Sequence, residues 1–179
     1  MCPEAWKNVH SALLLYWGEC ELISQISPAI KALHHALPDV QLTLITPDPN
    51  LQVNLKNNSL RVVSFLDWGL NLSASNELHS SNLRIAHTTV KSFIQTLIQQ
   101  SFDASIVFTN PTQSPYVLAY FCYLAGIPIR LGQSPEFGGG VLSTCVKPST
   151  ETDSIAHYHL HLLKEAGFST ENIAALAIA

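Results

Sequence analysis

Charged residues are scarce in this 179-residue chain. Asp, Glu, Lys and Arg make up 12% of it, against roughly 25% in an average soluble domain. The nine Lys and Arg form no cluster, and the formal net charge is −4. Nucleic acid is therefore excluded as a partner, because its phosphates are neutralised by grouped basic residues. The sparse charge predicts either a surface rich in Ser, Asn, Gln and Thr or one partly covered by another domain or subunit.

Targeting signals and paired cysteines are missing as well. No apolar run reaches the roughly 18–20 residues that a membrane-spanning helix needs, and the N-terminus lacks the basic, apolar and small-residue order of a signal peptide. The four cysteines lie at positions 2, 20, 122 and 145, with no CxxC pair and no framework spacing. They predict reduced thiols in a cytoplasmic protein.

The stretch from His10 to Asp39 reads as the first βα unit of a parallel sheet. Ser11–Trp17 is a continuous apolar run, as expected for a strand buried on both faces. Apolar residues then recur with a period near 3.6 from Leu22 to Leu37, which predicts an amphipathic helix. Pro28 indicates either a kink in that helix or a new helix start capped by Ser27.

Strands and helices alternate along the rest of the chain. The Tyr116–Ala125 helix is apolar almost all round, so we expect it to be the most buried, with Gly126 as its C-terminal cap. Asp153 is the expected N-cap of the last helix. The alternation predicts one Rossmann-like α/β domain, a doubly wound parallel sheet in three α/β/α layers. The expected strands are Gln41–Thr46, Arg61–Phe65, Asp103–Phe108, Ile127–Leu131 and about Val141–Thr144; the expected helices are Leu51–Leu55, Asn82–Gln100, Tyr116–Ala125 and Asp153–Ala166.

Four segments occur in an order that points to one family: PAIKAL from Pro28 with LPD and LTLIT behind it, FDASIVF, LAGIPIRLG, and a helix led by His157. Together they resemble glycosyltransferase family 9, the heptosyltransferase-like enzymes of lipopolysaccharide and related glycan synthesis. The resemblance covers about residues 10–168. It implies the N-terminal, acceptor-binding half of a GT-B enzyme, which works without a metal or other cofactor.

The resemblance also implies partners. The acceptor would be a glycan or lipid-linked sugar. The resemblance is also compatible with peripheral association of the protein with a membrane. A nucleotide-sugar donor would bind a second domain of about 150–170 residues, which we expect to be absent from this chain.

The loop Gly18-Glu19-Cys20-Glu21 is the expected catalytic segment. The family carries Gly-Asp here, with the aspartate as base, but counting back from Pro28 places Leu22 at the aspartate position. An inverting transfer needs a carboxylate to take the acceptor proton, so Glu21 is the candidate base. The alternatives are that it stabilises the first turn of the helix or is a solvated side chain. Gly18 and Glu19 are candidate acceptor contacts.

Polar residues after the fourth expected strand are further candidates for acceptor binding. Loops after strands line the ligand crevice of such sheets, which favours Asn110, Thr112 and Gln113. Capping of the next helix by Thr112 or Ser114 is the alternative.

His157 and His161 share a helix face, with His159 pointing elsewhere. No Cys or carboxylate is spaced to complete a zinc site around them. By resemblance His157 would line the cleft between domains, and the alternative is an exposed or hydrogen-bonded histidine. Gly132–Gly140 is either a mobile surface loop or an acceptor contact, and neither glycine-containing segment matches a dinucleotide fingerprint or a P-loop.

Two rival functions stay open. The Leu22 mismatch is also compatible with a degenerate, non-catalytic binding or interaction module of the same fold. An unrelated flavodoxin-like domain is a third interpretation.

Overall fold

The computed structural model describes residues 2–18, 24–47, 60–70, 87–149 and 154–170, so the expected Leu51–Leu55 helix lies outside them. Within them, the strands and helices follow one another in the predicted order. The strands are β1 Ser11–Trp17, β2 Gln41–Thr46, β3 Leu60–Ser64, β4 Ala104–Thr109, β5 Ile129–Gln133 and β6 Thr144–Val146; the helices are α1 Ser27–Ala36, α2 His87–Gln100, α3 Tyr116–Leu124 and α4 Ile155–Glu165, after a 3-10 turn η1 at Glu4–Trp6.

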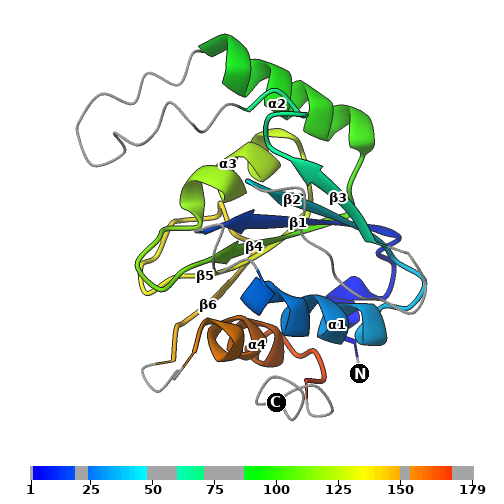
Figure 1. Ribbon diagram of the computed structural model, residues 1–179, viewed down its shortest axis with the longest axis vertical. Coiled ribbons are helices and arrows are strands. Elements are labelled where there is room, and N and C mark those ends of the chain that lie inside the picture. Colours follow the sequence, from blue (N-terminus) through cyan, green and yellow to red (C-terminus); the bar gives the residue numbers. More distant parts are fainter. Residues whose placement is uncertain (1, 19–23, 48–59, 71–86, 150–153, 171–179) are drawn as a thin grey trace.

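The strands form one parallel sheet in the order β3-β2-β1-β4-β5-β6. Helices α1 and α4 cover one face and α2 and α3 the other, so the molecule has three α/β/α layers (Figure 1). The predicted Rossmann-like fold is confirmed. The chain leaves β1 in one direction toward β3 and returns to the other side of β1 at β4, which makes the β1–β4 boundary the switch point of the sheet.

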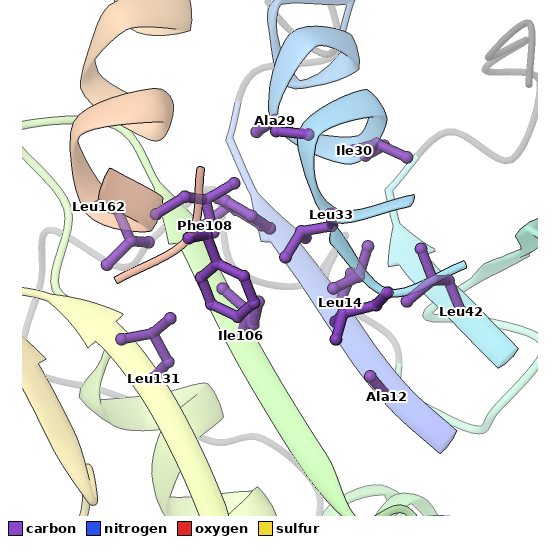
Figure 2. Close-up of a cluster of buried hydrophobic side chains, with 14 of the residues drawn as sticks. Ala12, Leu14, Ala29, Ile30, Leu33, Leu42, Ile106, Phe108, Leu131 and Leu162 are labelled. Carbon is purple, nitrogen blue, oxygen red and sulfur yellow. The ribbon is translucent and has the colours of Figure 1, made fainter. Parts of the chain in front are cut away.

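Both faces of the central strands are buried, which explains their unbroken apolar sequence. Along β1, Leu14 and Tyr16 pack in the cluster under α1 and α4, whereas Leu13 and Leu15 pack in the cluster under α2 and α3. All four side chains have no exposed surface. Figure 2 shows the first cluster, in which side chains of α1 and α4 point onto those of the strands.

Helix α1 begins later than its periodicity predicted. A 3-10 turn at residues 24–26 precedes it, and the helix starts at Ser27 with Pro28 in its first turn. Proline is tolerated there because the first N–H groups of a helix have no intrahelical partner. Of the two interpretations, the new start is therefore correct, although Ile26 rather than Ser27 occupies the N-cap position.

Local sequence signals set the C-terminal end of α3 and the start of α4. Gly126 has a φ of +78°, and the N–H of Ile127 donates to the carbonyl of Cys122 as in a Schellman motif. Pro128 follows and cannot donate to a strand ladder, so β5 begins at Ile129 rather than at the expected Ile127. Helix α4 is capped by Ser154, whose side chain accepts from the His157 N–H at 3.2 Å, instead of the expected Asp153, which lies outside the described residues.

The expectation that α3 is the most buried helix is wrong. Its inner face packs on the sheet through Leu118, Ala119, Phe121 and Cys122, but the outer face leaves four large apolar side chains between 45% and 51% exposed. These are Val117, Tyr120, Tyr123 and Leu124. None of the helices in the described part of the chain has the length and apolar character that crossing a bilayer demands.

The glycine-rich segment after β5 is tied to the body of the domain. Gly132 lies within β5, so the connection to β6 spans residues 134–143. Tyr116 donates from its hydroxyl to the carbonyl of Glu136, and its ring lies where a Cβ on Gly138 would be. These contacts fasten the segment to the first residue of α3.

Arg130 holds the other end of this segment. Its side chain is 9% exposed, with Nε donating to the carbonyl of Val141 at 2.6 Å and Nη2 to that of Gly140 at 3.0 Å. Nη1 donates to the carbonyls of Ile127 and Pro128. One guanidinium thus joins the end of the β5–β6 connection to the two residues before β5.

Replacing Arg130 with Lys should lower the free energy of unfolding by about 2–3 kcal/mol, because an ammonium group cannot reach four carbonyls in a planar fork. Urea unfolding measures the change. The matched control is Arg61→Lys, whose side chain makes an exposed 3.4 Å hydrogen bond to Gln100 and lies over the ring of Trp68, 5.8 Å from its centroid, but binds no backbone carbonyl in the described residues. Equal unfolding midpoints for the two variants would contradict the structural role of Arg130.

Candidate functional site

The switch point brings the ends of β1 and β4 together. Trp17 pairs with Thr109 in the parallel register, so Gly18 and Asn110 are the next residues at the same edge. A Cβ on Gly18 would overlap the Tyr16 phenol and lie 3.0 Å from Oδ1 of Asn110. The glycine is therefore required by the close approach of its neighbours.

Asn110 and Gln113 form a closed turn after β4. The backbone N–H of Asn110 donates to Oε1 of Gln113 at 3.2 Å, and the N–H of Gln113 donates to the Asn110 carbonyl at 3.0 Å. Asn110 is 7% exposed, and its Oδ1 is buried without a hydrogen-bond partner among the described residues. Gln113 thus stabilises the turn, and the Oδ1 of Asn110 can accept a hydrogen bond from a ligand.

The neighbouring candidates have different positions. Thr112 is exposed. Ser114 lies just before α3, and its Oγ accepts a hydrogen bond from the N–H of Tyr116, the first residue of that helix, at 3.4 Å. Glu19 and Glu21 lie outside the described residues, and the described residues at the carboxyl ends of β1 and β4 carry no carboxylate.

His157 is partly exposed on α4. His161, on the same helix face, has Nε2 at 3.1 Å from the carbonyl of Lys147. In the described part of the chain no three His, Cys, Asp or Glu side chains are grouped closely enough to hold a metal ion. No hydrogen bond within that part joins His157 to Gly18 or Asn110.

The histidine that faces the sheet is His159. It is 1% exposed, and its ring lies 5.2 Å from Phe108 and 6.2 Å from Tyr16, edge to face with both. Neither ring nitrogen has a hydrogen-bond partner among the described residues. Burial lowers the pKa of His159 to about 3, so the imidazole is neutral at neutral pH.

Gln133 is the second polar side chain that sequence reasoning missed. It ends β5, is 2% exposed, and both amide atoms are without a partner in the described residues. Val107 pairs with Gly132, so Gln133 stands beside Phe108. The spacing of His159 from Ala156 and Leu163, three and four residues away, indicates the buried helix face; no comparable signal marks Gln133.

Among the comparisons with known proteins, the one with solved structures supports the fold. No protein-family model and no curated protein matches the sequence. Among solved structures, the chain is similar to a glycosyl transferase of family 9 from Veillonella parvula, with a TM-score of 0.59 and 14% identity over 93% of this chain and 43% of that one.

Two further similar structures are of the E. coli heptosyltransferase WaaC. The form with ADP gives a TM-score of 0.56 at 12% identity, covering 89% of this chain and 48% of that one. The form with ADP-2-deoxy-2-fluoro heptose gives 0.55 at 13%, covering 89% and 49%. The chain therefore has the fold of a part of these glycosyltransferases and spans less than half their length.

Gly18→Ala should destabilise the fold by about 1–3 kcal/mol, because the added methyl group overlaps the fully buried Tyr16. Chemical denaturation gives the value. Gly140→Ala is the matched control, since a Cβ there meets nothing within 4 Å, and its cost should stay within about 0.5 kcal/mol. If Gly18→Ala were as stable as Gly140→Ala, the close approach at the switch point would be refuted.

His159 should make stability fall in mild acid. The unfolded histidine titrates near 6.5 and the folded one at about 3, so between these values only the unfolded state takes up the proton. The free energy of unfolding should drop by about 2 kcal/mol from about pH 7 to about pH 5. Urea unfolding at several pH values measures this loss.

His159→Leu should remove this part of the pH dependence, and His157→Gln, on the same helix but partly exposed, should retain it. An unchanged dependence in His159→Leu would show that another group is responsible.

Proposed function

We propose that this chain is the acceptor-side half of a metal-independent, inverting glycosyltransferase of the GT-B type. Paired with a donor-binding domain, it would help transfer a sugar from a nucleotide sugar to a hydroxyl of a glycan or lipopolysaccharide-type acceptor. The observation that carries the proposal is the structural match, which uses 89–93% of this chain and 43–49% of each neighbour. One domain of a two-domain enzyme would give this asymmetry.

The names of the neighbours support the reaction class. Two of them hold ADP or an ADP-linked fluoro heptose, which favours a nucleotide sugar as donor. The free thiols of Cys2, Cys122 and Cys145 in the described residues agree with a cytoplasmic location.

In this proposal Glu21 is the general base. Its carboxylate would take the proton of the acceptor hydroxyl as that oxygen attacks the anomeric carbon. Asn110, beside Gly18 at the switch point, would hold the acceptor through its unpaired Oδ1. Glu19, Thr112 and His157 would contribute outer contacts, and Gln113 would act by fixing the turn that carries Asn110.

A non-catalytic binding module is the second candidate. The observation that favours it is Leu22, an apolar residue at the position where the resemblance places the catalytic aspartate. Such a module would bind the glycan without transferring sugar.

Glu21→Gln should separate the two candidates. In a transfer assay on the chain reconstituted with a donor-binding domain, loss of a general base should lower kcat about 10²–10⁴-fold. Glu165→Gln, an exposed carboxylate at the end of α4 that has no part in the proposed site, is the matched control and should retain the rate. Transfer that is unaffected by Glu21→Gln would remove Glu21 as the base, and glycan binding without any transfer would favour the binding module.

A further inference from the structure

Three polar side chains near the carboxyl ends of the central strands are buried with unused hydrogen-bonding atoms. These atoms are Oδ1 of Asn110, both amide atoms of Gln133 and both ring nitrogens of His159, none of which has a partner among the described residues. The three residues are 7%, 2% and 1% exposed. Since buried polar groups are almost always paired in native proteins, this concentration at one edge calls for a ligand.

The strand register puts the three on the same side of the sheet. Tyr16 pairs with Phe108, and Gln133 stands beside Phe108, so these residues form a row across β1, β4 and β5. Neighbouring residues of adjacent strands share a face, and Tyr16 and Phe108 belong to the cluster under α1 and α4. His159 of α4 lies over this row, with its ring 5.2 Å from Phe108.

Asn110 belongs to the same face one step closer to the edge. It follows Phe108 by two residues, which returns its side chain to the Phe108 side. At 7% exposure it is the least buried of the three. A group entering from the switch point would therefore meet Asn110 before His159 and Gln133. Thr109, whose hydroxyl is also without a partner among the described residues, falls on the opposite face and is not part of this set.

The chemistry of the set is neutral. A glutamine amide and a neutral imidazole each offer both a donor and an acceptor, and Asn110 adds an acceptor. Burial keeps His159 uncharged. Arg130, the buried cation of β5, directs its guanidinium to the carbonyls of the β5–β6 connection. Donors and acceptors without charge match hydroxyl groups, which need both, and do not match phosphate or carboxylate.

We propose that Asn110, Gln133 and His159 form a subsite for an uncharged hydroxyl or hydroxymethyl group of the acceptor, and that it discriminates against sugars with an anionic group at that position. The inference rests on the proposed function, because it names the acceptor class of the same site. Burial limits the ligand group to a small one, a single hydroxyl-bearing arm of a sugar ring.

The test compares neutral and anionic sugars on the 179-residue chain. Binding of methyl α-D-glucopyranoside, D-glucuronate and D-glucose 6-phosphate would be followed by two-dimensional NMR of the amide groups. The expected result is that the neutral glycoside binds and shifts the signals of the three residues, while the two anions bind at least about tenfold more weakly, because the subsite has no cation to pair with them.

Gln133→Met gives a second readout that a purely structural residue would not move. The substitution keeps the side-chain shape and removes both unpaired amide atoms, so it should raise the unfolding midpoint. It should also weaken the neutral glycoside about tenfold. His159→Leu should weaken it similarly, which keeps the test decisive if Gln133→Met does not fold. Gln41→Met, an exposed strand residue at the amino end of β2, is the matched control and should change neither quantity.

Three results would overturn the inference. The first is equal glycoside affinity in the wild type, Gln133→Met and His159→Leu. The second is preferred binding of the anionic sugars. The third is a crystal structure in which ordered water alone fills the set and stays in place when the glycoside is added. Each leaves the proposed function standing, because that function is tested separately, by the transfer assay.

Discussion

The parallel pairing of β1 between β2 and β4 is the constraint on which the rest of the structure depends. It buries both faces of β1, so two layers of helices are required, one for the Leu14 side and one for the Leu13 side. It also makes the order in which strands are added to the sheet reverse at β1, from the β2 side to the β4 side. Gly18 and Asn110 meet at that reversal because their strands are in register there, and the candidate site is a consequence of the topology.

Two residues within the segments that suggested the family turn out to serve the scaffold. Asp103, in FDASIVF, accepts from the N–H groups of His10 and Ser11 at 2.8 and 3.0 Å and joins the amino ends of β1 and β4, opposite to the candidate site. Arg130, in LAGIPIRLG, binds four carbonyls, two in the β5–β6 connection and two just before β5. A resemblance carried by such residues supports a fold more strongly than an activity, as the structural matches at 12–14% identity also do.

The sequence predicted the strands best, because burial on both faces dominates their composition. Strands buried on both faces read as apolar runs, and β2 was placed at its observed bounds. Composition failed for α3, because an apolar helix without a polar stripe does not reveal which face meets the sheet. The candidate site was half predictable: Asn110 follows a strand end, whereas Gln133 and His159 are brought together only by the β4–β5 register and the packing of α4, which no local pattern encodes.

The position of the polar set argues against an accident of packing. Two residues before Phe108 and Gln133 the same layer is filled by Ile106 and Leu131, and Leu162 of α4 packs in the same cluster (Figure 2), so apolar residues fit between α4 and the sheet. An unpaired buried polar group costs about 1–3 kcal/mol, a sizeable part of a typical net stability of about 5–15 kcal/mol. A sequence under selection for stability alone would continue the apolar layer through residues 133 and 159. Such departures from local consistency are expected at functional sites, and this one falls beside the switch point, where a sheet of this topology binds its ligand.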